Sequence, residues 1–587
     1  MIKHRAIVFI SVLAIGLGVA GGFVAPLLMK LIGFITNLSF YGRISSDFSS
    51  PAENHLGAWV ILIPALGGII VGIMARWGSK AIRGHGIPEA MEQVLEGNSR
   101  IPARITFLKP ISAAVAIGTG GPFGAEGPII ATGGALGSVF GQALSTTGAE
   151  RKTLLAAGAA AGMAATFGSP VSAVLLAVEL LLFEFRARSI IPVALAAGVA
   201  AGMRIKLMGA EAIFAMPEFA PVSLGALALY ALMGVIIGVA AVVVTRIVYW
   251  IEDMFEHLPV HWMWWPAIGG LVVGLIGYFA PRTLGVGYDN IADILSNRFS
   301  LHLIVFLCLM KFISWSIALS SGTSGGTLAP LFTIGSGAGA TLGAFFLWLL
   351  PASGVDVRVA ALVGMAAIFA GASRALLASV VFAFETTHQT NGLLPLLVGC
   401  TLAYLVARML MQNSIMTEKI ARRGLKIPED YDADVFLQTT VAAAMDKEVK
   451  PLAADMLVST LADRIARHDP EVSVRDAWPL VNPDHQLVGI ITRNDIVRSM
   501  DKAGAHNLKL SEAGSSQVVT VFPDETVHEA VARMLTHGIG RLLVVSRADP
   551  TQMIGYVSRT HLLSTKFRQV QSEQVREDGW IKKRSIS

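Results

Sequence analysis

Up to about residue 415 the chain contains long apolar runs that follow one another, and its pattern changes near residue 425. Representative runs are Ala58–Met74, Ile190–Met203, Ala226–Val244 and Leu301–Leu319. Each run approaches the roughly 20 residues that a helix needs to cross a bilayer. After residue 425, short apolar stretches alternate with charged residues, as they do in a soluble domain. The pattern therefore predicts a helical membrane part followed by a soluble part.

Composition and charge support this division. Of 587 residues, 53% are hydrophobic and only 15% are charged, whereas about a quarter of the residues in a typical soluble chain carry a charge. Basic residues form short clusters between the apolar runs, such as Arg151–Lys152 and Arg422–Arg423, and such clusters often mark cytoplasmic loops. No basic stripe with interleaved aromatic residues is present, so we expect no nucleic acid partner. Cys308 and Cys400 lie singly in apolar segments and are expected to be core residues, with no disulfide or metal site.

The membrane part contains an internal repeat. The matching segments are Gly121–Pro128 with Thr323–Pro330, Gly133 and Gly137 with Gly335 and Gly339, and Gly158–Ala161 with Gly364–Ala367. Both copies then run on to a lone acid, Glu179 in one and Glu385 in the other. Gly/Ala-rich helices can resemble one another by composition alone, but here the Gly-Pro punctuation and the terminal acids coincide as well. Two such halves predict a binding site at their interface.

Three breaks of the form G-x-x-x-P interrupt apolar segments. They are Gly84-His-Gly-Ile-Pro88, Gly124-Ala-Glu-Gly-Pro128 and Gly326-Thr-Leu-Ala-Pro330. Non-helical backbone cannot face lipid, because each unsatisfied N–H or C=O group costs several kcal/mol there. A helix that begins directly after a break presents free N–H groups and about half a positive charge. We therefore expect the three breaks to line a cavity that binds an anion.

In this order the three breaks resemble the anion-selectivity motifs of the CLC chloride channel and transporter family, GSGIP, G(K/R)EGP and GxFxP. The resemblance covers roughly residues 1–423. It implies an all-α polytopic membrane domain of two inverted repeats with broken helices. Members are usually homodimers with one anion pathway in each subunit, so a homodimer is the expected assembly.

Glu126 is the most informative single residue. A carboxylate inside an apolar segment is expensive and is by default functional. At a predicted helix N-terminus it would compete with an anion for the same N–H groups. By resemblance Glu126 matches the family's gating glutamate, and its protonation would open the path. The alternative is a simple helix cap at the surface.

The remaining expected anion-binding residues come from the same motifs and from the last membrane segment. They are His85, Gly86, Ile87, Gly127, Thr327, Leu328 and Met416. His85 stands where the family usually has a serine that donates to the anion, and an imidazole can also donate and can change its charge near neutral pH. Its alternative is an ordinary polar residue at a loop bend. Leu328 stands at the usual phenylalanine, Ala125 at a common base, and Met416 at the family's pore tyrosine.

Proton coupling is a further point of departure. In proton-coupled members an internal acid often follows directly after the residue that matches Glu179, whereas this chain has Leu180, which carries no proton. Channel members tend to be apolar at this place, but some exchangers also lack the acid. We expect Glu179 and Glu385 themselves to be structural.

The soluble part repeats too. Leu487-Val-Gly-Ile-Ile-Thr-Arg-Asn-Asp-Ile496 resembles Met553-Ile-Gly-Tyr-Val-Ser-Arg-Thr-His-Leu562. Both resemble the strand-to-helix segments of an α/β pair of CBS domains, in which Thr/Ser and Asp hold an adenosine ligand. Thr492 and Asp495 keep that pattern, while Ser558 keeps half of it because a histidine replaces the acid. We expect one adenine-nucleotide site at most; the alternative is a purely structural module.

The predicted organisation is a membrane domain over residues 1–423, a linker over 424–439, a CBS pair over 440–567 and a tail over 568–587. We expect a voltage- or pH-gated chloride channel or transporter in the cell (inner) membrane, with its C-terminal domain in the cytoplasm. An anion/proton or chloride/bicarbonate exchanger is the alternative within the family, and nitrate also stays open. A membrane-anchored nucleotide sensor is an alternative of another class. We do not expect an enzyme or a required cofactor, since the common catalytic motifs are missing.

Overall fold

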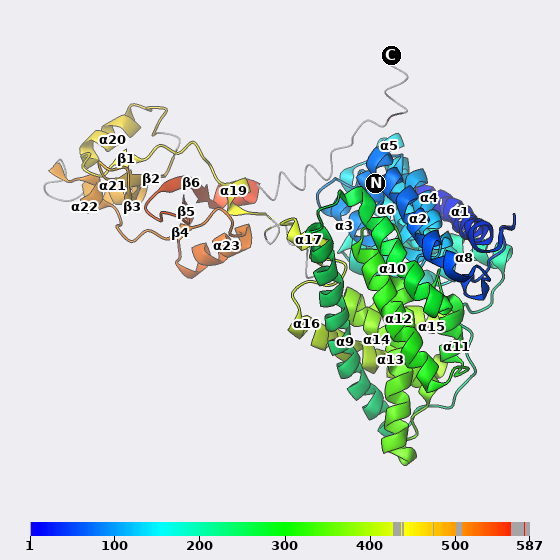
Figure 1. The fold of residues 1–587 in the computed structure, drawn as a ribbon. Coiled ribbons are helices and arrows are strands. Elements are labelled where there is room, and N and C mark those ends of the chain that lie inside the picture. Colours follow the sequence, from blue (N-terminus) through cyan, green and yellow to red (C-terminus); the bar gives the residue numbers. More distant parts are fainter. Residues whose placement is uncertain are drawn as a thin grey trace. The chain divides into compact units, whose positions relative to one another are not determined.

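The computed structural model describes residues 2–425, 436, 439–472, 475–500, 507–564 and 580 (Figure 1). Two compact units are present, a helical one over the N-terminal three quarters of the chain and an α/β one after it. Most of the expected linker (424–439) and most of the expected tail (568–587) lie outside the described residues.

The helical unit contains two sets of helices in the same order. The first set is α1 (Ile2–Thr36), α2 (Leu62–Ile73), α3 (Ile87–Leu95), α4 (Ile105–Gly118), α5 (Glu126–Ala143), α6 (Gly148–Phe167), α7 (Pro170–Ala177) and α8 (Ala187–Met208). The second set is α9 (Leu224–Glu256), α10 (Trp265–Phe279), α11 (Tyr288–Leu295), α12 (Leu301–Ser320), α13 (Leu328–Leu349), α14 (Val357–Ser373), α15 (Leu376–Thr387) and α16 (Leu393–Leu410). The short helix α17 (Glu418–Arg422) follows.

Matching helices make matching contacts. α1 packs against α6 and α8, and α9 packs against α14 and α16. α5 packs against α6, as α13 does against α14. Across the halves, α2 contacts its counterpart α10, and α7 contacts its counterpart α15. The two halves are therefore related by an approximate two-fold axis.

Two carboxylates, the buried Glu179 and the half-buried Glu385, show that the halves are inverted. Glu179, just after α7, accepts hydrogen bonds of 2.9 and 3.0 Å from two backbone N–H groups at the start of α15. Glu385, near the end of α15, accepts bonds of 3.0 and 2.8 Å from two N–H groups at the start of α7. Because the end of each helix lies at the beginning of the other, the two helices run antiparallel. The expectation that both acids are structural is confirmed.

Small residues let the helices within each half approach closely. A Cβ atom on Gly133 of α5 would lie 2.1 Å from the carbonyl oxygen of Gly158 in α6. In the second half, a Cβ atom on Gly335 of α13 would lie 2.5 Å from the carbonyl oxygen of Gly364 in α14. Small-residue contacts of this kind are typical of helix pairs in membranes, where no hydrophobic force drives helices together.

Within the described residues, several helices are long and apolar enough to cross a bilayer. These helices are α1, α2, α8, α9, α10, α12, α13 and α16, counting the short turns that extend α2 and α10. The protein is an integral membrane protein, and the predicted fold of two inverted repeats with broken helices is confirmed.

The α/β unit contains two three-stranded sheets of one design. In each sheet a two-residue strand pairs parallel with the central strand, which pairs antiparallel with the last strand. The first sheet has β1 (Leu452–Ala453), β2 (Ala477–Val481) and β3 (Leu487–Thr492), with helices α20 (Val458–Ala466) and α21 (Arg493–Met500). The second has β4 (Thr520–Val521), β5 (Arg541–Val545) and β6 (Met553–Ser558), with helix α23 (Val527–Thr536).

Each half of the α/β unit also completes the core of the other. α19 (Val441–Ala444) precedes the first sheet in sequence, but its two end residues pack in the core of the second sheet. α22 (Leu510–Ala513) precedes the second sheet, but Leu510 packs in the core of the first. The two halves therefore form one folding unit.

Candidate functional site

The three predicted breaks meet at one place in the helical unit. Gly124 and Gly326, at equivalent positions in the two halves, exchange a pair of backbone hydrogen bonds of 3.3 and 2.9 Å. Gly84 donates to the carbonyl of Thr323 at 3.3 Å and accepts from Gly325 at 3.4 Å. Loops that are far apart in the sequence are thus joined to one another inside the protein, and α3, α5 and α13 begin directly after them.

Glycine is required where these loops touch. A Cβ atom on Gly127 would lie 1.9 Å from the carbonyl oxygen of His85, and one on Gly124 would lie 1.7 Å from Oε2 of Glu126. Real Cβ atoms do not approach other atoms so closely. The glycines of the motifs therefore let three loops and one carboxylate share a small space.

Glu126 is fully buried at the first position of α5. Its Oε1 accepts a hydrogen bond of 2.9 Å from the hydroxyl of Tyr288 in α11. The backbone N–H groups of Glu126 itself and of Ala329, in the first turns of α5 and α13, also lie close to the carboxylate. The carboxyl group of Glu126 thus lies between two helix N-termini, where unpaired N–H groups favour an anion.

Some of the buried polar atoms that lack a hydrogen-bond partner belong to these loops. Within the described part of the chain, His85 Nδ1, Glu126 Oε2 and Thr327 Oγ1 make no hydrogen bond, although all three residues are buried. Buried polar groups in folded proteins are nearly always paired, so each exception needs an explanation. Three exceptions at one junction of loops fit a place that receives a polar ligand.

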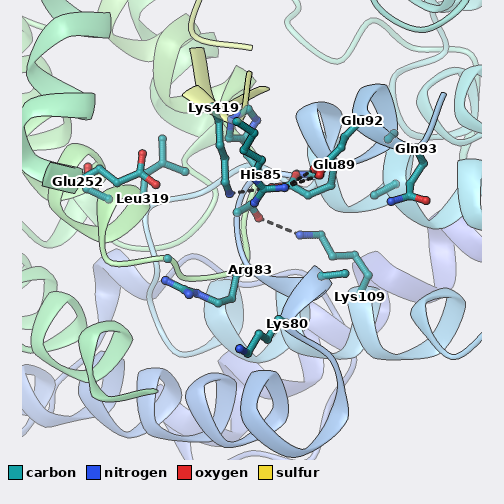
Figure 2. Close-up of a pocket in the computed structure, with 18 of the residues that line it drawn as sticks. Lys80, Arg83, His85, Glu89, Glu92, Gln93, Lys109, Glu252, Leu319 and Lys419 are labelled. Carbon is teal, nitrogen blue, oxygen red and sulfur yellow. Dashed lines mark hydrogen bonds and ion pairs between the residues drawn. The ribbon is translucent and has the colours of Figure 1, made fainter. Parts of the chain in front are cut away.

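A cavity of about 530 Å³ reaches this junction beside α3 (Figure 2). Of the predicted anion-binding residues, His85 and Gly86 line it. Glu89 accepts from the N–H of Gly86 at 2.7 Å and from Lys419 Nζ at 3.1 Å, and Figure 2 shows His85 and Glu89 between Lys419 and Lys109. The cavity therefore combines acidic and basic side chains around the start of α3.

The other predicted residues have different surroundings. Ile87 and Leu328 are buried first residues of α3 and α13, so their backbone N–H groups belong to open first turns. Met416 is buried, and its N–H donates to Ser414 Oγ at 3.2 Å. From the same segment, Ile415 lines the cavity. The structure thus brings Glu126, Gly127 and Thr327 together with His85, and places Met416 in the segment beside the cavity.

In the α/β unit, two separate pockets contain the predicted nucleotide-binding residues. Thr492 and Asp495 line a pocket of about 540 Å³, and Thr492 donates to Asp495 Oδ2 from its N–H (2.9 Å) and its hydroxyl (2.7 Å). Ser558 lines the other pocket, of about 770 Å³, together with His561. There the N–H of His561 donates to Ser558 Oγ at 3.3 Å, so His561 occupies the place that Asp495 has in the first repeat.

Comparison with protein families gives a direct result for both units. The family described as voltage gated chloride channel matches residues 66–408, and the CBS domain matches residues 441–502 and 510–567. The chain belongs to the voltage gated chloride channel family. The CLC resemblance and the CBS pair are confirmed.

Known CLC proteins match over much of their length. Chloride channel protein CLC-f of Arabidopsis thaliana is 28% identical over 561 residues, which cover 84% of this chain and 71% of that protein. The H(+)/Cl(-) exchange transporter ClcA of Vibrio parahaemolyticus is 28% identical over 421 residues, 70% of this chain and 89% of that one. The names of these relatives include both a channel and an exchanger.

Solved CLC structures share the fold. A slow cyanobacterial Cl−/H+ antiporter aligns with a TM-score of 0.62 at 24% identity, over 71% of this chain and 98% of that one. A eukaryotic CLC transporter aligns with a TM-score of 0.59 at 20% identity, over 96% of this chain and 99% of that one.

Two buried lysines in the CLC unit were missed by the sequence analysis. Lys109 of α4 donates to the carbonyls of Ile82 and Gly84, both at 2.8 Å. Lys311 of α12 donates to the carbonyls of Thr283 and Gly285, both at 2.9 Å. The signal was present, because each lysine stands alone in an apolar run at the same distance before the repeated Gly-rich motif.

Two tyrosines in the CLC unit were also missed. Tyr288 contacts Glu126, as described above. Tyr249 of α9 lines the cavity and donates from its hydroxyl to the carbonyl of Ile415 at 2.8 Å. The phenol of Tyr249 therefore lies beside the segment of Met416, but its hydroxyl proton is donated to the Ile415 carbonyl. No local sequence signal pointed to either tyrosine.

Proposed function

We propose that the protein conducts or exchanges small inorganic anions, chloride foremost, and that Glu126 is the protonatable gate of the pathway. The observation that carries the proposal is the fully buried Glu126 carboxylate between the first turns of α5 and α13. Free N–H groups at those turns would otherwise hold an anion, so the carboxylate and the anion compete for one place.

The proposed anion donors surround this place. They are the backbone N–H groups of Gly86, Ile87, Gly127, Thr327 and Leu328, the imidazole of His85, and the segment of Met416. Backbone N–H groups also accept bicarbonate and nitrate, so chloride is the expected anion among several. A path of this kind has no use in a protein that only anchors a nucleotide sensor.

The proposed gate responds to pH with a definite sign. When Glu126 is ionised, its charge occupies the anion place and closes the path. When it is protonated, the neutral side chain no longer competes and leaves, so anion flux rises as the pH falls. A charge that moves within the membrane field also responds to voltage, with about 2.3 kcal/mol per charge for each 100 mV.

The test is anion flux into liposomes that contain the purified protein, measured over a range of pH. We expect Glu126→Gln, which resembles the protonated gate, to keep anion flux and to lose most of its pH dependence. Glu385→Gln is the matched control, because it neutralises a carboxylate that caps α7 away from the three loops. Wild-type pH dependence in Glu126→Gln would exclude this gate, and no anion flux from the wild-type protein would exclude an anion pathway.

Proton-coupled exchange is the second candidate, favoured by the similarity to relatives that are named H(+)/Cl(-) exchange transporters. Against tight coupling stands Leu180, which is buried and offers neither a proton acceptor nor a donor on the family's usual proton route. An unsupported proton in low-dielectric protein is very costly. We therefore propose a pathway that is not tightly coupled to protons along that route.

The reversal potential decides between these candidates. A one-unit pH gradient corresponds to about 1.4 kcal/mol per proton, or about 60 mV for one charge. Fixed-ratio exchange would shift the reversal potential by a set fraction of this value, whereas an uncoupled pathway would not respond. A reproducible shift that Glu126→Gln abolishes would establish coupling and require another proton route.

For the rest of the assembly, we propose a homodimer in the cell membrane with the CBS pair in the cytoplasm. The first CBS repeat is proposed to bind an adenine nucleotide through Thr492 and Asp495, while Ser558 belongs to a second, weaker site. Titration calorimetry on the full-length protein in detergent with AMP, ADP and ATP tests this. Absence of heat with all three nucleotides would leave the CBS pair a structural module.

A further inference from the structure

Tyr288 reaches the Glu126 gate from the opposite half of the chain. Its hydroxyl donates to Glu126 Oε1 at 2.9 Å. Its ring packs edge-on against Phe167 and Phe214, each with a centroid distance of 5.9 Å and interplanar angles of 74° and 70°. Edge-to-face contacts of this kind restrict how an aromatic ring can tilt. The hydroxyl is therefore held in place toward the carboxylate.

The backbone that carries Tyr288 is anchored by Lys311. This lysine, fully buried in α12, donates to the carbonyls of Thr283 and Gly285, in the loop that leads into α11. Gly287 then caps α11 with a φ of 75°, and a Cβ atom there would lie 3.3 Å from Lys311 Nζ. Because Tyr288 is the first residue of α11, the anchored loop sets the position from which its side chain leaves the backbone.

The first half of the chain contains the same device with a different outcome. There Lys109 holds the carbonyls of Ile82 and Gly84, and Gly86 caps α3 with a φ of 94°. The residue that corresponds to Tyr288 is Ile87, the first residue of α3. The isoleucine side chain offers no polar atom, so of these two equivalent residues only Tyr288 brings a side-chain hydrogen-bond donor to Glu126.

We infer that Tyr288 is a positioning residue for the gate, whose hydroxyl holds the ionised Glu126 carboxylate in the anion place. The inference rests on the proposed function of Glu126. A hydrogen bond to a carboxylate is about twice as strong as one between neutral groups, so the phenol favours the ionised, closed gate over the protonated one. Tyr288 thereby determines the pH at which the path opens.

Few other titratable groups face Glu126. From α12, Lys311 acts on the carboxylate through its charge, but its ammonium is already bonded to two carbonyls. The loop before α13 (residues 322–327) and the rest of α5 contain no acidic or basic residue. From the loop before α3, His85 approaches through its carbonyl group, which lies against Gly127. Within the described residues, Tyr288 is therefore the side chain whose removal should change the gate most directly.

The test is Tyr288→Phe, which keeps the ring and removes only the hydroxyl. Without the donor the ionised carboxylate is held less strongly, so the gate should open at higher pH. We expect the pH of half-maximal anion flux in liposomes to rise by roughly one to two units, the range expected for one hydrogen bond to a charged group. Tyr230→Phe is the matched control, because the buried Tyr230 hydroxyl bonds to the backbone of Asp356 and not to the gate.

Tyr288→Phe is also tested in the Glu126→Gln protein, which separates the positioning role of Tyr288 from the gate role of Glu126. If Tyr288 acts through the gate, Tyr288→Phe should have no further effect on the pH profile of the Glu126→Gln protein. A wild-type midpoint in Tyr288→Phe, together with loss of pH dependence in Glu126→Gln, would overturn the role of Tyr288 and keep the gate. A midpoint that moves equally in Tyr230→Phe would also overturn it, because the effect would then be one of general packing.

Discussion

The two halves of the membrane unit share a framework but differ in the chemistry that the framework supports. Each half has one buried lysine that holds two carbonyls of a loop, Lys109 in the first and Lys311 in the second. Each half also has one glutamate that caps a helix of the other, Glu179 and Glu385. These contacts satisfy backbone groups that lipid cannot satisfy, so a half that lost them would be destabilised.

The side chains at the site do not follow this symmetry. Glu126 begins α5, whereas Leu328 stands near the same place at the start of α13. Tyr288 begins α11, whereas Ile87 begins α3. Because the two halves converge on one place, a single carboxylate is enough to fill it. The two halves thus supply two sets of helix N-termini. One half supplies the proposed gate, Glu126, and the other supplies its hydrogen-bond donor, Tyr288.

The largest expected effects test the shared framework. We expect Lys109→Met and Lys311→Met each to leave two buried carbonyls without a donor and to destabilise the protein by about 3 kcal/mol. The apparent melting temperature of the purified protein in detergent should fall by a similar amount in both variants. Lys206→Met, which changes an exposed lysine of α8, is the control. A large loss for one lysine and none for the other would contradict the idea of a common framework.

The next effect concerns Glu179 and Glu385, each of which caps a helix of the other half. In Glu179→Gln or Glu385→Gln an NH2 group replaces one acceptor oxygen and faces a backbone N–H, which should cost about 1–2 kcal/mol. The same thermal melts should show two similar losses, smaller than those of the lysine variants. Because neither acid lies at the three loops, the pH dependence of anion flux should stay as in the wild type. A changed pH profile would mean that the capping acids also belong to the gating chemistry.

Much of this framework could be predicted from the sequence, since it produces repeated Gly-Pro breaks and single charged residues in apolar runs. The repeated Gly-Pro breaks predicted loops that line a cavity, and the structure joins those loops by hydrogen bonds. The lone acids Glu179 and Glu385 were each expected to be structural, because both lie near predicted helix ends beside polar residues. Lys109 and Lys311 carried the same kind of signal, a single charge in each of two apolar runs.

The contacts around Glu126, the proposed gate, could not be predicted in the same way. Tyr288 meets Glu126 only because two helices from different halves pack together, and nothing in the residues around either one specifies that contact. Met416 was placed by its alignment with a family tyrosine, but which phenol comes to lie nearby depends on α9, from which Tyr249 extends. Contacts between distant segments follow from packing, and packing is not visible in a local pattern.

The CBS pair shows the same contrast on a smaller scale. Its two sheets have the same topology, and even the irregular register falls at the same place in both. The acid Asp495 of one repeat is nevertheless replaced by His561 in the other.

A different acid, Asp446, also lines the second pocket. Burial opposes its charge, but the N–H of Glu448 and the guanidinium of Arg475 outweigh burial and lower the pKa of Asp446. Asp446 is thus an ionised acid that is already paired.

The replacement of Asp495 by His561 between the two repeats predicts a tenfold change in nucleotide affinity. Asp495→Ala should weaken adenine-nucleotide binding at least tenfold, because a carboxylate accepts from two ribose hydroxyls and alanine from none. His561→Asp should add binding at the second repeat, seen as a higher stoichiometry in titration calorimetry on the full-length protein. If His561→Asp leaves the stoichiometry unchanged, the second pocket differs from the first in more than this one acid.

The smallest expected effect is at His85, the side chain by which the first half departs from the usual serine. The imidazole lines the cavity and its Nδ1 has no partner within the described residues, so it is available to an anion at the start of α3. His85→Ser would replace the imidazole, a hydrogen-bond donor, with a shorter hydroxyl. A typical single hydrogen bond contributes about 1 kcal/mol, so we expect a change of about fivefold in the permeability ratio of nitrate to chloride.

Val286→Ser is the control. Val286 stands between Gly285 and Gly287, just as His85 stands between Gly84 and Gly86, but it belongs to the loop before Tyr288. An equal change in both variants would show that selectivity depends on the packing of the paired loops, and a change in His85→Ser alone would show that it depends on the imidazole.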